Sequence, residues 1–220
     1  TTQRIKLTVN MRLMNNVLSV DTESNIARMQ PGALGPEIEE QLNSKGFTLG
    51  HFPDSFEFST LGGWVATRSA GMQSDAYGKI EDMVISARMV TTEGVLVTRD
   101  VPKCSNGIDV NNIVIGSEGI LGIITELSMR IKKLPEKKDF FGYFFPTFEQ
   151  GIQAMQACMR QGLAPVVSRL HDPKKTALSL AFRKQEGKLK SLISKLLRQY
   201  LCRIKKFDWD KICLLIICIE

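Results

Sequence analysis

Apolar residues recur along the whole chain in short runs, and turn-forming residues separate these runs. Alternation of apolar and polar positions indicates strands, and apolar residues spaced three or four apart indicate helices. Strands are expected at residues 17–20, 26–29, 83–90, 95–98, 123–131, 140–145, 165–170 and 212–219. Helices are expected at residues 34–42, 64–71, 148–161 and 184–206, and residues 109–115 fit either element. This mixture predicts an α+β fold.

A proline followed by charged residues divides the chain after Leu134. The sequence Pro135-Glu136-Lys137-Lys138 stands between two apolar elements, as a domain boundary commonly does. We therefore expect one domain over residues 1–134 and another over residues 135–220. The chain begins without Met in a polar segment and ends just after the strand at 212–219, whose composition predicts full burial. Both ends are typical of an internal piece of a longer protein.

Charge and cysteine content narrow the function classes. The net charge is +6, but basic residues alternate with acidic ones until the last third of the chain, which argues against a nucleic-acid-binding surface. The five cysteines form no C-x-x-C pair, as expected of reduced thiols, and no metal site is predicted. The apolar run at 212–219 is far shorter than the ~20 residues of a membrane span. The basic helix at 184–206 is compatible with peripheral membrane association, although the strand that follows favours packing on a sheet.

The first candidate binding element is the sequence Ser59-Thr60-Leu61-Gly62-Gly63, which we call the first glycine bend. Hydroxyl groups donate to phosphate oxygens, and paired glycines let backbone N–H groups approach a diphosphate. With the helix expected at 64–71, that diphosphate would lie at a helix N-terminus. The pattern is neither G-x-G-x-x-G nor a Walker loop. The alternative is a Gly-Gly turn that Ser59 or Thr60 caps.

A second glycine bend covers residues 116–122, with the sequence GSEGILG, and leads into the strand at 123–131. Three glycines at a strand entrance suggest a backbone that another body approaches closely. The alternative is a tight, bulged turn.

Four segments resemble one known family in order and spacing. They read FPDSFEFSTLGGWVATRSAGM, YGKIEDMV, GSEGILGIITE and APVVSRLHDP. They are similar to the alkyldihydroxyacetonephosphate synthases, flavoproteins of the vanillyl-alcohol-oxidase type with a PCMH-type FAD-binding domain. The resemblance implies that residues 1–134 are the C-terminal portion of that domain, its second subdomain. It also implies that residues 135–220 are the truncated start of a β-α-β substrate-binding cap.

FAD is the cofactor that the resemblance implies, held by three segments. The matching positions are Pro53, Asp54, Ser55, Phe56, Glu57, Phe58 and Ser59; then Ala66, Thr67, Arg68 and Ser69; then Glu118, Gly119, Ile120, Leu121, Gly122, Ile123 and Ile124. Arg169 matches an arginine important for activity, and a guanidinium suits the phosphate of an acyl-dihydroxyacetone phosphate. The alternative role for Arg169 is an ion pair with Asp172.

The function implied is that of a transferase of ether lipid (plasmalogen) biosynthesis. Such an enzyme exchanges the acyl group of 1-acyl-dihydroxyacetone phosphate for a long-chain fatty alcohol through a flavin N5 adduct, without net redox. A peroxisomal location and a homodimer are expected of the intact parent. The family's catalytic tyrosine and His-rich loop are expected beyond residue 220, so these residues alone are predicted to be inactive. The alternatives are a piece of an FAD-dependent 2-hydroxyacid dehydrogenase, or a piece that retains no flavin.

Other polar residues near these segments are expected to have structural roles. A turn-stabilising hydrogen bond accounts for His51, and His171 is assigned no chemistry. Tyr77, Glu81 and Asp82 lie close in sequence to the first bend, and we expect the two carboxylates to be solvated or to brace the loop.

Overall fold

The computed structural model describes residues 8–103, 105–163, 165–182 and 199–220. It divides into two compact units, Thr1–Pro135 and Glu136–Glu220, which we call the first and the second unit. The helix expected at 184–206 falls mostly outside the described residues, and only a π-helical stretch, η1 (Tyr200–Ile204), is described at its end. Both units mix helices with strands, which confirms the α+β prediction.

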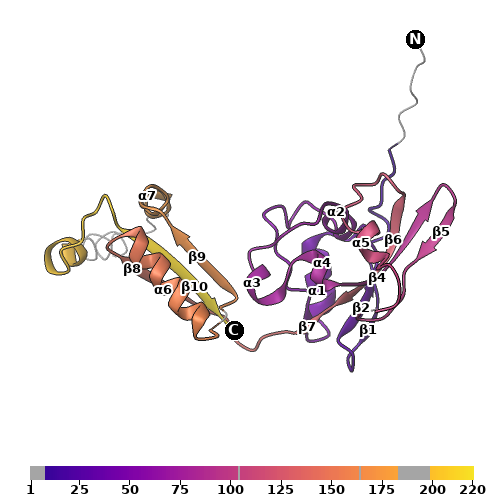
Figure 1. Cartoon of the computed structure of the whole chain (residues 1–220), viewed down its shortest axis with the longest axis horizontal. Coiled ribbons are helices and arrows are strands. Elements are labelled where there is room, and N and C mark those ends of the chain that lie inside the picture. The colour runs from indigo at the N-terminus through magenta and orange to yellow at the C-terminus, as the bar shows by residue number, and fades with distance from the viewer. Residues whose placement is uncertain (1–7, 104, 164, 183–198) are drawn as a thin grey trace, which may run out of the picture. The chain divides into compact units, whose positions relative to one another are not determined.

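An antiparallel five-stranded sheet forms the body of the first unit (Figure 1). Its strand order is β1-β2-β6-β4-β5, so β6 joins two hairpins that are distant from it in sequence. A separate two-stranded ladder pairs β3 with β7. The strands are β1 (Val17–Asp21), β2 (Ile26–Met29), β3 (Phe47–Thr48), β4 (Val84–Thr91), β5 (Gly94–Val97), β6 (Ile123–Arg130) and β7 (Lys132–Lys133).

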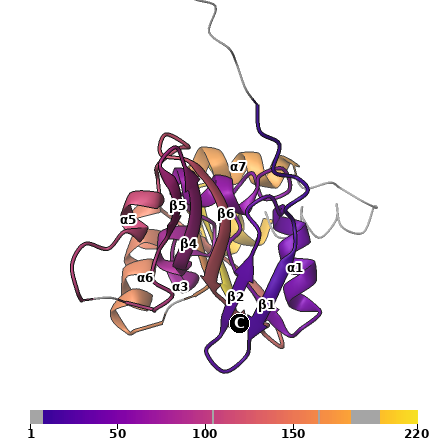
Figure 2. The same ribbon diagram turned by 90° about the vertical axis from the view of Figure 1, so that its right-hand side faces the viewer.

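The helices of the first unit are short, and the sheet lies in front of them in Figure 2. Side chains from α1 and α2 share one core with the sheet, and Leu42, Trp64 and Leu127 are nearly inaccessible. Burying these side chains contributes roughly 1.5–3 kcal/mol each. The helices are α1 (Gly35–Asn43), α2 (Leu61–Thr67), α3 (Ser74–Tyr77), α4 (Ile80–Met83) and α5 (Asn111–Val114). The sequence analysis did not predict α3 or α4.

The second unit contains a three-stranded antiparallel sheet in the order β8-β10-β9. Its strands are β8 (Asp139–Phe145), β9 (Val167–His171) and β10 (Cys213–Ile219), and its helices are α6 (Phe148–Arg160) and α7 (Pro173–Phe182). Thr147 caps α6, because its hydroxyl accepts a hydrogen bond from the Gln150 N–H. The sequence analysis missed α7, which begins where the Asp172 carboxylate accepts a bond from the Lys175 N–H.

The prediction that residues 212–219 are fully buried was wrong. Cys213, Leu215 and Cys218 of β10 are buried, whereas Leu214 is half-buried and Ile219 is 52% exposed. The composition of a strand gives its apolar content but not which faces of the sheet are covered. The helices in the described part of the chain cover this strand only in part. No helix in the described part of the chain is long and apolar enough to cross a membrane.

Candidate cofactor-binding site

The first glycine bend forms a capped helix start rather than an anion site. Helix α2 begins at Leu61, three residues earlier than expected, with Thr60 as its N-cap. Its first N–H groups are bonded within the protein: Leu61 to the Ala33 carbonyl at 3.0 Å, Gly62 to the Pro31 carbonyl at 2.8 Å and Gly63 to the Thr60 hydroxyl. The hypothesis of a diphosphate at this helix N-terminus was therefore wrong, because these donors are not available.

Gly62 allows α2 to approach the segment before α1. A Cβ at this position would lie 2.7 Å from Cβ of Pro31, closer than real side chains pack. The glycine pair thus reflects packing within the protein at Gly62, not an approach of the backbone to a ligand.

The end of α2 and the second glycine bend are joined by their backbones. The Gly116 N–H donates to the Val65 carbonyl at 2.9 Å, and the Glu118 N–H donates to the Ala66 carbonyl at 3.0 Å. The bend needs left-handed backbone at Gly116, Glu118 and Gly119, with φ of 81°, 49° and 78°. Two of the three predicted cofactor segments, 66–69 and 118–124, therefore lie side by side.

Trp64 attaches the remaining segment, residues 53–59, to α2. Its indole N–H donates to Oγ of Ser59 at 2.6 Å, and its ring stacks with that of Phe56. The Ser59 hydroxyl in turn donates to the Ser55 carbonyl at 2.7 Å. These contacts place the first segment on the same helix that bonds to the second bend.

His51, which precedes the segment 53–59, bonds to the end of the segment 66–69. Its Nε2 lies 2.7 Å from Oγ of Ser69, and its ring meets that of Trp64 edge-on at 5.1 Å. The expected hydrogen bond is present, but it spans 18 residues rather than one turn. Burial lowers the pKa of His51 from 6.5 to about 4, so the ring is neutral at physiological pH.

The predicted cofactor positions differ in their solvent exposure and in the contacts that their side chains make within the protein. Ser55, Phe56, Ser59, Thr67, Arg68 and Ser69 use their side chains in contacts within the protein. Pro53 and Ile124 are buried, and Ala66 and Gly122 are half-buried. The exposed positions are Asp54, Ser55, Glu57, Phe58, Thr67, Arg68, Glu118, Gly119, Ile120, Leu121 and Ile123.

Exposed apolar side chains on the segments 53–59 and 118–124 fit a large cofactor. Phe58 is 85% exposed and Ile120 is 86% exposed, although apolar residues of this size usually find cover. Next to Ile120, no atom lies within 4 Å of the position that a Cβ of Gly119 would take. Apolar side chains beside accessible backbone suit a ligand with both an aromatic ring system and polar atoms, such as FAD.

Glu81 and Asp82 brace their loop, as expected. The Asp82 carboxylate accepts a bond from the Lys79 N–H at 2.8 Å, and the Glu81 carboxylate pairs with Arg68 at 3.1 Å. The sequence analysis did not link Glu81 with Arg68, because Glu81 lies 13 positions after Arg68 and no motif places the two together.

Arg169 lies in the second unit, on β9, where it is exposed. Its partner on the neighbouring strand β10 is Ile216. Among the described residues it makes no ion pair with Asp172, whose carboxylate instead accepts the Lys175 N–H. The neighbouring His171 is buried, and its Nδ1 lies 3.2 Å from Oγ of Ser179. Burial, followed by the charges of Lys175 and Arg169, lowers the pKa of His171.

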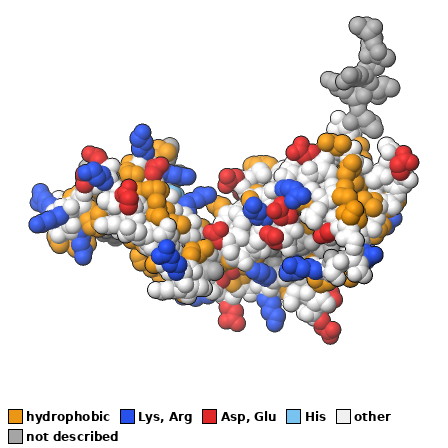
Figure 3. Space-filling view, in the orientation of Figure 1, with side chains coloured by type: hydrophobic (Ala, Val, Ile, Leu, Met, Phe, Trp, Pro, Cys, Tyr) orange, Lys and Arg blue, Asp and Glu red, His pale blue; other side chains and the backbone are white. Residues whose placement is uncertain are grey.

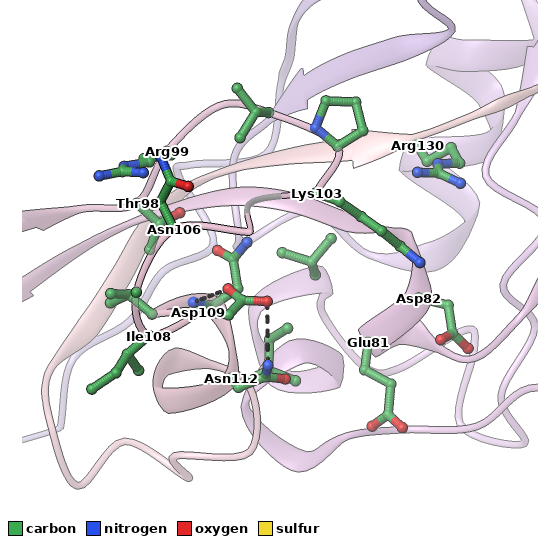
Figure 4. Close-up of a pocket in the computed structure, with 17 residues that line it drawn as sticks. Glu81, Asp82, Thr98, Arg99, Lys103, Asn106, Ile108, Asp109, Asn112 and Arg130 are labelled. Carbon is green, nitrogen blue, oxygen red and sulfur yellow. Dashed lines mark hydrogen bonds between the residues drawn. The ribbon is translucent and has the colours of Figure 1, made fainter.

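A cavity of about 730 Å³ lies elsewhere in the first unit (Figure 4). Lys103, Asp82 and Arg130 lie along one side of it, and Asp109 accepts bonds from Asn111 and Asn112 on the other. None of the predicted cofactor positions lines this cavity.

Acidic and basic side chains are interspersed on the surface that Figure 3 shows. No group of three metal-ligating side chains occurs among the described residues.

Comparisons with known proteins identify related families. Residues 1–100 match the family described as "FAD binding domain", and residues 134–220 match "FAD linked oxidases, C-terminal domain". Alkyldihydroxyacetonephosphate synthase from Dictyostelium discoideum is 44% identical over 99% of this chain, and that from Trypanosoma brucei brucei is 41% identical over all of it. A solved structure of an alkyldihydroxyacetonephosphate synthase superposes on the whole chain with a TM-score of 0.87 at 43% identity and is covered to 40%.

The chain belongs to the FAD-linked oxidase class of flavoproteins, and its first unit has the fold of a PCMH-type FAD-binding domain. Within that class, it belongs to the alkyldihydroxyacetonephosphate synthase family. Its cofactor is FAD, which the descriptions of both matching family models name. The chain spans 36% of the length of the two relatives named above.

Proposed function

We propose that this chain is the part of an alkylglycerone-phosphate synthase that holds one side of FAD and begins the substrate cap. Residues 1–134 supply the C-terminal portion of the FAD-binding domain, and residues 135–220 supply the N-terminal portion of the cap. The observation that carries this proposal is the pair of backbone hydrogen bonds from Gly116 and Glu118 to α2, since they bring two predicted cofactor segments together.

Each segment has a distinct task in this proposal. The exposed side chains of Phe58, Ile120 and Leu121 cover apolar surface of the cofactor, and the open backbone at Gly119 lets it approach closely. When bound, FAD supplies the ring system at which the acyl group is exchanged for an alkyl group. Arg169 offers two parallel N–H donors to the substrate phosphate, which an exposed guanidinium without an ion-pair partner among the described residues can do.

The intact parent converts acyl-dihydroxyacetone phosphate and a long-chain fatty alcohol into an ether lipid precursor. Its expected setting is the peroxisome, as a homodimer associated peripherally with the membrane. The names of the relatives support the substrates, because both are alkyldihydroxyacetonephosphate synthases. The 220 residues by themselves span too little of those relatives to be an active enzyme in this proposal.

Flavin absorbance tests the cofactor proposal. The extended reading frame that contains this chain should yield a yellow protein with flavin bands. Phe58→Asp combined with Ile120→Asp should weaken FAD binding about tenfold or more, because charges would then face the cofactor's apolar surface. Val95→Asp, at an exposed apolar position on β5, is the control. A colourless wild-type protein that takes up no added FAD would contradict the proposal.

Arg169→Lys tests the substrate site separately. A lysine keeps the charge but cannot bind a phosphate with two parallel donors, so ether-bond formation should fall by about 100-fold while the flavin stays bound. Arg160→Lys, on the exposed end of α6, is the control. Retained synthase activity would remove Arg169 from the site. Reduction of a dye with a 2-hydroxy acid would favour the alternative dehydrogenase.

A further inference from the structure

Arg68 is predicted to contact the cofactor, yet its guanidinium is used within the first unit. Its Nη1 donates to the Glu81 carboxylate on α4 at 3.1 Å. Its Nη2 donates to the Asn112 carbonyl on α5 at 3.4 Å. Because two donors of this side chain face protein partners, contact with a ligand is not needed to explain its charge.

The same side chain lies against the second glycine bend. A Cβ added to Gly116 would fall 2.6 Å from Nε of Arg68 and 3.0 Å from its Cγ and Cδ. Gly116 has a φ of 81° as well, so both its backbone conformation and its lack of a side chain let the bend lie on Arg68.

Arg68 therefore lies where three elements meet. It is the C-cap of α2 with a φ of 52°, and its side chain reaches α4 and α5 across the bend. The two backbone bonds that join the bend to Val65 and Ala66 lie immediately before it in sequence. If the arginine were lost, those two backbone bonds would still join α2 to the bend.

We propose that Arg68 and Glu81 form a positioning pair that holds the second glycine bend on α2, and so sets FAD affinity without either side chain touching FAD. This inference rests on the proposed function, in which the bend receives the cofactor. It differs from the expectation that Arg68 binds FAD directly, and the difference can be measured at Glu81.

FAD titration of the extended protein separates the two roles. If Arg68 acts through the pair, Arg68→Ala and Glu81→Gln should each weaken FAD binding roughly tenfold, within the range typical of coupled sites. The double variant should be no weaker than Arg68→Ala, because both changes remove one interaction. If Arg68 instead contacts FAD, Glu81→Gln leaves the guanidinium free to bind and affinity is unchanged or tighter. That outcome would overturn the inference.

Arg12→Ala provides a matched control. Arg12 pairs with Glu37 at 3.2 Å with side-chain exposures of 45% and 30%, against 43% and 30% for Arg68 and Glu81. Its loss should leave FAD affinity unchanged. Equal weakening by Arg12→Ala would show a general charge effect and would also overturn the inference.

Amide hydrogen exchange in the 220-residue chain needs no flavin and so distinguishes this inference from the proposed function. The N–H groups of Gly116 and Glu118 should exchange at least fivefold faster in Arg68→Ala and Glu81→Gln than in the wild type, while β6 amides keep their rates. Unchanged exchange at the bend would overturn the positioning role even if FAD binds. Faster exchange in a protein that never binds FAD would support the positioning role of Arg68 and Glu81 and would refute only the proposed function.

Discussion

His51 combines deep burial with a single described hydrogen bond. The residue is 1% exposed, Nε2 meets the Ser69 hydroxyl, and the buried Nδ1 has no partner among the described residues. Its pKa falls to about 4 because burial disfavours the charged ring. Between about pH 6.5 and pH 4 the unfolded chain binds a proton that the folded chain does not, so stability is present above this window and lost as the pH falls through it.

We predict a pH-dependent loss of stability that depends on His51. Lowering the pH from about 7 to about 5.5 should remove about 1 kcal/mol of unfolding free energy through this residue. His51→Gln keeps a group that can bond to Ser69 but does not titrate, and should lose less by about that amount. In a Trp209→Phe background, urea denaturation followed by Trp64 fluorescence measures both. His171→Gln is the control, because this residue lies in the second unit and its loss should not change the first-unit transition that Trp64 reports. Equal losses in His51→Gln and wild type would contradict the prediction.

The hydroxyl groups of the first bend and of Ser69 show what sequence can indicate at the residue scale. Ser59, Thr60 and Ser69 are the residue types that bind phosphate, but each is bonded to Trp64, Gly63 or His51. A short sequence pattern gives the capacity to form hydrogen bonds and not the identity of the partner. The neighbouring position Phe58 behaves differently, because its 85% exposure could be recognised only from the structure.

The junction of β4 and β6 depends on a glycine at the end of the second bend. A Cβ at Gly122 would lie 2.2 Å from the Val90 carbonyl oxygen, which belongs to rigid backbone. Val90 pairs with Ile123 and Met89 with Ile124, so a displacement here would change the start of the central ladder. The close approach therefore fixes where β6 begins relative to the bend.

Gly122→Ala should destabilise the first unit by about 2 kcal/mol, because β6 must move away from β4 to accept the methyl group. Chemical denaturation tests this, followed through Trp64 for Gly122→Ala and through Trp209 for the comparison variant in the second unit. Gly142→Ala in β8 is the comparison, since its Cβ would meet only a Leu214 side-chain carbon at an ordinary 3.5 Å. If Gly122→Ala cost no more than Gly142→Ala, the steric argument would fail.

Long strands could be predicted from the sequence because their signal is local. Alternation places β4 and β6 within a few residues of their observed bounds. The two-residue strand β3 pairs with β7 more than 80 residues later, so neither has a local pattern to detect. Helix α7 is a different case, because Asp172 followed by Pro173 is a recognisable helix start that the sequence analysis overlooked.

At the scale of the whole molecule, each unit has its own sheet and buried residues. The first unit contains a contiguous core that draws on its sheet and helices. Buried apolar residues of the second unit are fewer among the described residues: Val166, Leu201, Ile212, Cys213, Leu215 and Cys218. Because buried apolar area drives folding, we expect the second unit to be the less stable of the two.

The two tryptophans allow this expectation to be tested, because one lies in each unit. Trp209→Phe leaves Trp64 to report on the first unit, and Trp64→Phe leaves Trp209 to report on the second. In urea, the Trp209 signal should change at a lower concentration than the Trp64 signal and with a smaller m-value, since the second unit exposes less surface on unfolding. Coincident transitions in both variants would mean that the chain unfolds as one cooperative body, and the division at Pro135 would then not describe its stability.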